Sequence, residues 1–282
     1  MCASPAYLRP ARLSEALAAL ADGSRLVLAG GTDVYPARVG RPLAEPVLDV
    51  TALPELAGIA EDEAGWRIGA ATRWSTLASA PEHPLFAALR AAAREVGGRQ
   101  IQNAGTIGGN LCNASPAADG APCLLAMEAS VELASTRGVR TLPLADFLLG
   151  NRRTARAADE LLVAVRIPRP GGTARSAFLK LGARRYLVIS IAMVAVVVVL
   201  GTDGRIASAR VAVGACAPVA IRLAELEVDL AGRPLDPTLP AVVLARHIEP
   251  LQPLDDIRAT AAYRRDAALT LVRRTLEALS GP

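Results

Sequence analysis

One stretch of the sequence, Asn103 to Asp119 (NAGTIGGNLCNASPAAD), combines residue types that could bind a phosphate group. It holds three glycines, Gly105, Gly108 and Gly109, among small polar residues. Glycine lets a backbone approach a ligand closely and adopt positive φ, and successive N–H groups in such a loop form a nest for anions. We therefore predict a phosphate-binding loop. The alternative is a tight turn whose polar residues only cap it.

A second glycine pair follows a short apolar run. Arg25 to Ala29 (RLVLA) has the pattern of a strand and leads into Gly30-Gly31-Thr32-Asp33. The sequence contains neither the G-x-G-x-x-G of Rossmann folds nor the G-x-x-x-x-G-K-[ST] of P-loops. Two glycine loops about 75 residues apart are consistent with a clamp on one extended ligand such as a pyrophosphate, with the Thr32 and Thr106 hydroxyls as further donors. A plain turn is the alternative for the second pair.

One basic residue differs from all the others. Of 31 lysines and arginines, only Lys180 is a lysine. A lysine retained against this bias indicates a place for a compact ammonium rather than a planar guanidinium, next to a phosphate or an electron-rich ring; chance is the alternative. Asp119 could accept a hydrogen bond from a ribose or ribityl hydroxyl, or merely cap the helix predicted after it.

The composition argues against several other classes of protein. The formal charge of +4 and 3% aromatic residues give little support to a nucleic-acid surface. Four widely spaced cysteines form no zinc-ribbon or iron–sulfur pattern, so we expect reduced thiols in a cytoplasmic protein and no metal site. With two histidines, His83 and His247, outside every polar cluster, a catalytic triad is not expected.

The longest apolar run, Tyr186 to Leu200, has 15 residues, fewer than the roughly 20 that a membrane helix needs. Its valine content predicts a buried strand instead, and we expect no membrane span. Other strands and a turn around Gly201 to Gly204 suggest a C-terminal meander backed by helices, an α+β layer beginning after the boundary at Pro170 to Thr173. The helices are predicted at Leu223–Leu230, Leu239–His247 and Ile257–Leu279.

Four segments together resemble a known family. Leu26 to Val34 (LVLAGGTDV), Gln102 to Asp119 (QNAGTIGGNLCNASPAAD), Leu161 to Pro168 (LLVAVRIP) and Phe178 to Arg185 (FLKLGARR) are similar to the FAD-binding medium subunit of the molybdenum hydroxylases. That family includes the xanthine dehydrogenases and carbon monoxide dehydrogenases. The resemblance covers nearly the whole chain in family order.

The resemblance implies an α+β chain: an FAD-binding fold of the vanillyl-alcohol-oxidase type over residues 1–172, in two subdomains (about 1–52 and 53–172), then a C-terminal domain over 173–282. It implies two cofactor loops, an aspartate contact at Asp119, a backbone contact near the flavin at Leu162, and the family lysine at Lys180. The loop residues are Val27, Leu28, Ala29, Gly30, Gly31, Thr32, Asp33 and Val34 in the first, and Thr106, Ile107, Gly108, Gly109 and Asn110 in the second.

By the same resemblance, the chain binds FAD non-covalently and needs no catalytic acid or base. A molybdenum cofactor in a large subunit would hydroxylate the substrate, and two [2Fe-2S] clusters in a small subunit would carry electrons to FAD. NAD⁺ or another acceptor would then receive them. Within the family, the segments GGNLCNASPAAD and RRYLVIS look most like those of the xanthine dehydrogenases, so the resemblance favours a purine as the substrate of the complex. A carbon monoxide dehydrogenase-like or other aromatic hydroxylase subunit is the alternative, as are a self-sufficient flavoprotein oxidase and a non-catalytic nucleotide-binding module.

Two positions depart from the family pattern. Gln102 replaces a usual arginine, and Tyr186 to Ser190 (YLVIS) replaces the acidic residue common after the paired arginines Arg184 and Arg185. The arginine pair could face a partner or the cofactor phosphates, or be solvated. Cys112, inside the second loop, is expected to be a packing residue rather than a redox thiol.

Overall fold

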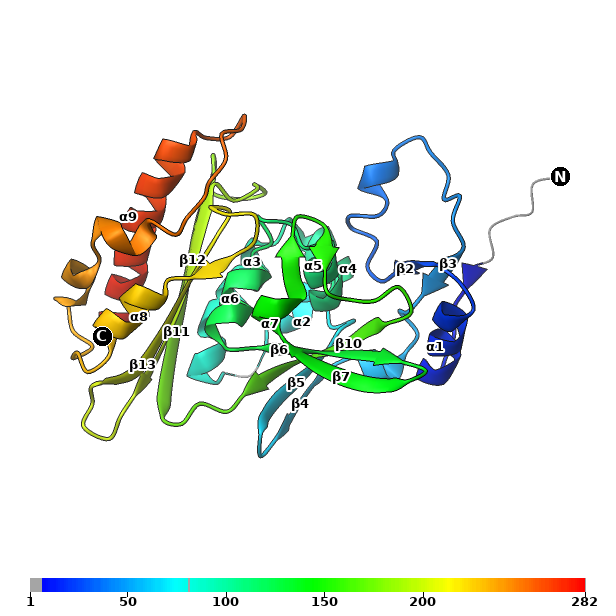
Figure 1. Cartoon of the computed structure of the whole chain (residues 1–282), viewed down its shortest axis with the longest axis horizontal. Coiled ribbons are helices and arrows are strands. Elements are labelled where there is room, and N and C mark those ends of the chain that lie inside the picture. The colour runs from blue at the N-terminus through cyan, green and yellow to red at the C-terminus, as the bar shows by residue number, and fades with distance from the viewer. Residues whose placement is uncertain (1–6, 81, 282) are drawn as a thin grey trace.

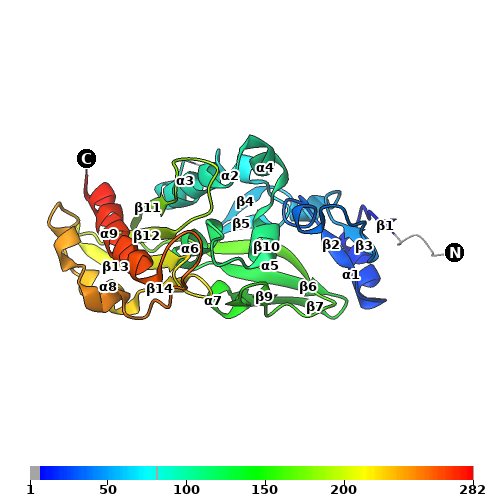
Figure 2. The same cartoon turned by 90° about the horizontal axis from the view of Figure 1, so that it is seen from above.

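The computed structural model describes residues 7–80 and 82–281, and Cys2 lies outside this range. Its elements form three groups along the long axis of the molecule (Figures 1 and 2): a small parallel sheet at one end, an antiparallel sheet with short helices in the middle, and a second antiparallel sheet covered by helices at the other end. The predicted α+β class is confirmed. None of the helices in the described part is long and apolar enough to cross a membrane.

The N-terminal group is a three-stranded parallel sheet in the order β1-β3-β2. Strand β2 ends at Leu28, so the loop that carries Gly30 and Gly31 leaves the sheet at the carboxyl end of a parallel strand. Ligands commonly bind at this end of parallel strands. The elements are β1 (Tyr7–Leu8), α1 (Leu13–Ala21), β2 (Leu26–Leu28), η1 (Pro36–Arg38) and β3 (Val47–Asp49).

The middle group is built on a five-stranded antiparallel sheet in the order β4-β5-β10-β6-β7. Between β5 and β6 the chain leaves this sheet and forms a run of short helices, which carries the second glycine loop. The strands are β4 (Ile59–Asp62), β5 (Gly65–Gly69), β6 (Ser130–Ser135), β7 (Gly138–Pro143) and β10 (Leu161–Pro168), with a hairpin of β8 (Leu148–Gly150) and β9 (Arg153–Thr154). The helices are η2 (Pro54–Leu56), α2 (Trp74–Leu77), η3 (Pro84–Phe86), α3 (Ala87–Glu95), α4 (Arg99–Ala104), α5 (Ile107–Asn113), α6 (Gly120–Ala126) and α7 (Leu144–Phe147).

The C-terminal group is an antiparallel sheet in the order β11-β12-β13-β14, backed by α9 and α8. Its elements are β11 (Thr173–Leu181), β12 (Ala192–Leu200), β13 (Ile206–Gly214), β14 (Ile221–Arg222), α8 (Ala224–Leu230), η4 (Leu239–Val242), η5 (Ala245–Ile248) and α9 (Ala261–Ser280).

Strand β12 is apolar throughout because both of its faces are buried. Met193, Ala195 and Val197 belong to the core of the first two groups, whereas Val194 and Val196 belong to the core beneath α8 and α9. Side chains alternate across a strand, so an uninterrupted apolar run is what a doubly covered strand requires. This strand therefore joins the C-terminal group to the rest of the molecule.

Two sequence predictions about these elements were wrong. The run from Tyr186 to Leu200 is not one strand, because residues 182–191 form a loop and β12 begins only at Ala192. In this loop Leu187 has φ +53°, a conformation that no regular strand contains. The helix predicted at Leu239–His247 is instead two 3₁₀ segments separated at Val243, whose φ and ψ are extended.

A buried arginine, Arg264, connects α9 to the residues just before β12 and just after β13. Arg264 is 4% exposed. Its Nη1 donates to the carbonyls of Ile191 (2.6 Å) and Ala215 (3.1 Å), and its Nη2 donates to Asp256 Oδ1 at 2.7 Å. These bonds hold the start of β12, the segment after β13 and the loop before α9 around one guanidinium. The loop of residues 182–191 is thereby anchored at its C-terminal end.

We predict that Arg264→Ala lowers the free energy of unfolding by about 3–5 kcal/mol, because it removes the donor from the carbonyls of Ile191 and Ala215 and one of the cationic partners of Asp256. Urea denaturation measures this loss. The exposed Arg274 on the same helix is the matched control, and Arg274→Ala should change stability by no more than about 0.5 kcal/mol. Equal losses in both variants would show that the Arg264 bonds contribute nothing special.

Candidate functional site: a cavity between two glycine loops

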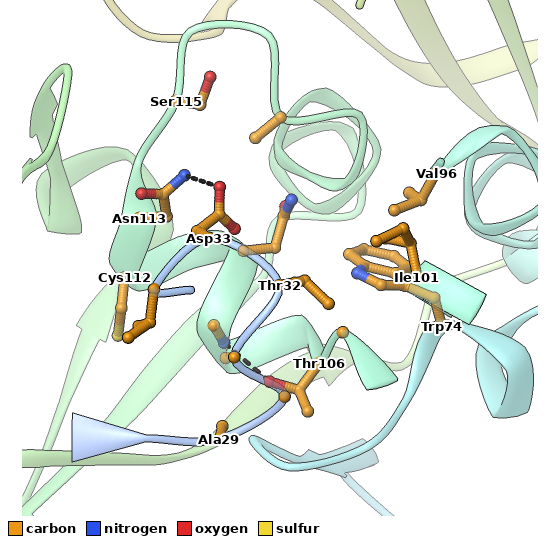
Figure 3. A pocket seen from close by; sticks show the side chains of 18 of the residues that line it. Ala29, Thr32, Asp33, Trp74, Val96, Ile101, Thr106, Cys112, Asn113 and Ser115 are labelled. Atoms are coloured by element: carbon orange, nitrogen blue, oxygen red, sulfur yellow. Dashed lines mark hydrogen bonds between the residues drawn. The ribbon is translucent and has the colours of Figure 1, made fainter. Parts of the chain in front are cut away.

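A cavity of about 750 Å³ lies where the three groups meet, and both glycine loops line it. Figure 3 shows Thr32 and Asp33 of the first loop facing Thr106, Cys112 and Asn113 of the second segment. Trp74, Val96 and Ile101 form an apolar wall on another side. The remaining wall comes from the loop before β12, through Leu187, Val188 and Ile189.

The first loop touches the second segment closely enough to require glycine. A Cβ atom on Gly30 would lie 1.9 Å from the carbonyl oxygen of Ala104, at the end of α4. Gly31 has φ +69°, which side chains rarely permit. Within the described residues, the backbone N–H groups from Gly30 to Asp33 donate no hydrogen bond. This loop therefore offers a row of free donors at the cavity, as predicted for an anion-binding loop.

The second loop differs from its prediction. Thr106 is the N-cap of α5, and its hydroxyl accepts the N–H of Gly109 at 3.0 Å. The N–H groups of Ile107 and Gly108 donate to the carbonyls of Thr72 and Ala70. The expected nest of free N–H groups is thus wrong for this segment, because neighbouring backbone and the cap satisfy them. Gly108 serves close packing instead, because a Cβ there would lie 2.7 Å from the Ala70 oxygen.

One side-chain hydrogen bond joins the two segments across the cavity. Asn113 Nδ2 donates to Asp33 Oδ1 at 3.0 Å (Figure 3). Asp33 is exposed and Asn113 is partly buried, so this bond lies at the rim. It closes the two loops over the space between them.

The predicted lysine and aspartate form a buried ion pair. Lys180 Nζ lies 2.7 Å from Asp119 Oδ2, and the two side chains are 6% and 7% exposed. The ammonium also donates to the carbonyl of Glu95 at 3.3 Å, and Ser190 Oγ donates to Asp119 Oδ1 at 2.6 Å. Both charged residues line the cavity. The only lysine of the sequence is therefore paired with one carboxylate at the cavity.

Asp119 does not cap the helix that follows it. Helix α6 begins at Gly120 as expected, but the Asp119 side chain makes no cap hydrogen bond, so capping as its role is wrong. Burial raises the pKa of this carboxyl, and the Lys180 ammonium and the Ser190 hydroxyl oppose that rise. The pair is thus held in a place where charge is costly, which indicates function more than stability.

Two buried polar atoms at the cavity lack a partner. Among the described residues, four buried side-chain nitrogen or oxygen atoms have no hydrogen bond, and two of them, Arg25 Nη1 and Asn110 Oδ1, belong to residues that line the cavity. Unpaired buried groups are rare because each forfeits its bond to water. A donor and an acceptor are therefore available to a polar ligand here.

Fourteen of the 16 predicted cofactor-binding residues line the cavity; Leu28 and Ile107 do not, because both are buried in the core. Sequence reasoning missed several lining residues outside the two glycine stretches, namely Arg25, Trp74, Val96, Ile101, Arg156 and the segment 187–189. Most are ordinary apolar residues whose sequence carries no signal of a ligand.

The other singled-out residues fall outside the cavity or are inert. Cys112 lines it, but burial raises the pKa of its thiol to about 11, which makes it a poor nucleophile at neutral pH. Gln102 is buried and donates to the Arg94 carbonyl, a structural contact. Arg184 and Arg185 are exposed: the first donates to the Leu187 carbonyl, and the second stacks on Tyr186.

Neither histidine reaches the cavity. His83 Nδ1 accepts the N–H of Leu85, and His247 Nε2 lies 3.0 Å from Asp229 Oδ2. In the part of the chain that the structure describes, no group of three or more His, Cys, Asp or Glu residues could hold a metal ion.

Comparison with known proteins identifies the family. Residues 3–170 match the FAD binding domain in molybdopterin dehydrogenase, and residues 177–279 match the CO dehydrogenase flavoprotein C-terminal domain. The chain belongs to the FAD-binding medium subunits of the molybdenum hydroxylases. FAD is therefore the cofactor of this chain.

Individual relatives cover almost the whole chain. The nicotine 6-hydroxylase medium subunit of Paenarthrobacter nicotinovorans is 33% identical over 275 residues, 96% of this chain and 95% of that protein. The xanthine dehydrogenase FAD-binding subunit of Escherichia coli O157:H7 is 33% identical over 276 residues, 96% and 94% of the two chains. Carbon monoxide dehydrogenase from Hydrogenophaga pseudoflava contains a chain with a TM-score of 0.88 and 31% identity, covering 99% of this chain and 98% of that one.

We predict that Gly30→Ala destabilises the protein by about 1–3 kcal/mol, because the new Cβ would overlap the Ala104 carbonyl and force the two loops apart. Thermal unfolding followed by circular dichroism measures the loss. Gly23→Ala is the matched control, since a Cβ at Gly23 meets no heavy atom within 4 Å and should cost no more than about 0.5 kcal/mol. If the two variants unfold alike, the loops do not depend on this contact.

Proposed function

We propose that this chain is the electron-relay subunit of a molybdenum hydroxylase and holds FAD non-covalently through the residues that line the cavity. The observation that carries the proposal is the convergence on one cavity of the first loop's free N–H groups and the Lys180–Asp119 pair. A row of N–H donors suits the pyrophosphate of FAD, and a buried charge pair suits its redox-active ring.

The residues present fit FAD. The volume of about 750 Å³ falls in the usual range for a cofactor site. The unpaired Arg25 Nη1 and Asn110 Oδ1 supply a donor and an acceptor that a polar cofactor would satisfy. The N–H groups of Gly30 to Asp33 would hold the pyrophosphate, and Gly108 and Gly109 would let it approach α5 closely.

The two ends of the cavity favour one orientation of FAD. Figure 1 shows β2 and the connection between β11 and β12 on opposite sides of α5. At the second of these ends Leu187 and Ile189 are 57% and 51% exposed, so a ring bound there could exchange electrons with partners. We assign the isoalloxazine to this end, beside Lys180. Arg25 directly precedes β2 and would contact the adenosine half, and Leu162, expected near the flavin, lines the same cavity.

When bound, FAD accepts electrons and passes them on as hydride or singly. The chain's own residues would hold and orient it: Trp74, Val96 and Ile101 would pack against it and exclude water. The Lys180 ammonium, balanced by Asp119, would lie beside the ring and would stabilise negative charge on it. No acid or base of this chain is required.

The partners would be a large molybdenum subunit and a small [2Fe-2S] subunit, with NAD⁺ or another molecule as the final acceptor. We propose a xanthine dehydrogenase-type complex, which the resemblance of the second loop and of residues 184–190 supports. Relatives named for nicotine and for xanthine are equally identical to this chain, so a different hydroxylase is the alternative. Co-purification and sequencing of the partners decides between them, because the substrate pocket belongs to the large subunit.

A self-sufficient oxidase with a histidine-linked flavin is less well supported, because neither His83 nor His247 lines the cavity. Release of all flavin on acid denaturation, together with no turnover of small substrates by the isolated chain, would leave the relay function standing.

We predict that Gly109→Val weakens FAD binding at least about 100-fold, or about 2.8 kcal/mol, while the protein stays folded. Gly109 lines the cavity and is exposed, and its Cβ would meet only the Thr106 hydroxyl within 4 Å, so the added side chain would occupy cofactor space. Titration of the apoprotein with FAD, followed by flavin fluorescence, gives the affinity.

The matched control is Gly171→Val, at a glycine that has open space around it and does not line the cavity. It should bind FAD as the wild type does. Retained binding in Gly109→Val would refute the assignment of α5 to the pyrophosphate, and absence of FAD binding by the wild type would refute the proposed function.

A further inference from the structure

Ser190 places a buried hydroxyl on the charge pair at the cavity. The residue is 1% exposed, and its Oγ donates to Asp119 Oδ1 at 2.6 Å. The other carboxylate oxygen is held by Lys180, so the carboxylate lies between a hydroxyl and an ammonium. Ser190 ends the YLVIS segment, where the sequence departs from the family's usual acidic residue. The uncharged Ser190 hydroxyl therefore contacts Asp119 from a segment in which the family usually has an acidic residue.

The backbone around this hydroxyl is fixed. The N–H of Ile191 donates to the Leu181 carbonyl at 2.8 Å, and the Ile191 carbonyl accepts Arg264 Nη1 at 2.6 Å. Ser190 is thus anchored from β11 and from α9. Because the donor is held in place before any ligand binds, little conformational freedom is lost in keeping its hydrogen bond.

We propose, on the basis of the proposed function, that Ser190 is a positioning residue that tunes the redox potential of bound FAD by keeping Asp119 charged against Lys180. With both partners charged, the pair presents no net charge to the ring beside it. If Asp119 takes up a proton, Lys180 remains as a net positive charge. That charge favours the anionic reduced flavin, which forms when FAD gains two electrons and one proton from a reductant.

The direction of the effect follows from the groups that face Asp119. Lys180 of β11 and Ser190 favour its charged form, and burial opposes it. The Cys123 thiol of α6 is neutral, because burial and Asp119 itself raise its pKa well above the usual value. Glu95 of α3 contributes only its backbone carbonyl, to Lys180. Removing the Ser190 hydroxyl would therefore raise the pKa of Asp119 further and let it become protonated as the pH falls.

The test measures the ratio of reduced to oxidised flavin in the FAD-loaded full chain, equilibrated against a reference dye between pH 6 and pH 9. In Ser190→Ala this ratio should rise over the wild type by about tenfold at pH 6, which is about 30 mV for a two-electron couple, and the difference should shrink toward pH 9. Ser190→Thr keeps a hydroxyl and should restore the wild-type ratio.

Asp119→Asn, measured at saturating FAD, removes the negative charge permanently. It should shift the ratio toward reduced flavin at every pH, including pH 9, and adding Ser190→Ala to it should cause no further shift. These variants keep the proposal falsifiable if Ser190→Ala alone does not fold.

Ser176→Ala is the matched control for loss of a buried hydroxyl. Ser176 lies on β11, bonds to Pro84, Leu85 and Ala88, and does not line the cavity, so the variant should lose stability without changing the flavin ratio. Ratios within twofold of the wild type in both Ser190→Ala and Asp119→Asn would overturn the proposal. A wild-type chain that binds no FAD would instead overturn the proposed function.

Discussion

The buried ion pair between Lys180 and Asp119 is the interaction on which the site depends. It joins β11 of the C-terminal sheet to the start of α6 in the middle group, at 2.7 Å and almost out of contact with water. Burying two charges is expensive, and the structure offsets part of that cost with the Ser190 hydroxyl and the Glu95 carbonyl. Apolar residues of similar size would stabilise the fold as well or better. Such a pair beside a cavity that two glycine loops line supports the proposal that the cavity holds a charged, redox-active ligand.

The fold brings these groups together from three separate sheets. The first loop leaves the carboxyl end of a parallel strand, the second segment is packed against the antiparallel sheet through Ala70 and Thr72, and Lys180 arrives from the C-terminal sheet. Strand β12, buried on both faces, makes the C-terminal sheet part of the same core. The Gly30 contact with Ala104 shows how little space separates the loops. Disrupting the contacts of the first loop, the second segment or the C-terminal sheet would move one wall of the cavity.

Much of this site could be predicted from the sequence, because the two glycine loops and the single lysine point to it and the resemblance to the FAD-binding medium subunits supplies the remaining residues. Fourteen predicted residues line the cavity. A row of free N–H groups was expected on both loops but is found on the first, because the N–H groups of Ile107 to Asn110 bond to Thr106 and to the distant residues Thr72 and Ala70. The 186–200 run was taken as one strand because apolar pattern alone does not mark where a loop with positive φ ends. The hydrogen-bond partners of Ser190 and Asn113 are distant in sequence, so nothing local in the sequence predicts these two bonds.

Amide hydrogen exchange with and without FAD shows whether the cofactor lies between the two glycine loops. The N–H groups from Gly30 to Asp33 have no acceptor in the described chain, so the account predicts that FAD slows their exchange most. Protection should also extend to residues 186–190, whereas α8 and α9, which lie outside the cavity, should be unchanged. Unchanged exchange at Gly30 to Asp33 in the presence of saturating FAD, or protection confined to the C-terminal helices, would contradict a cofactor site between the two glycine loops.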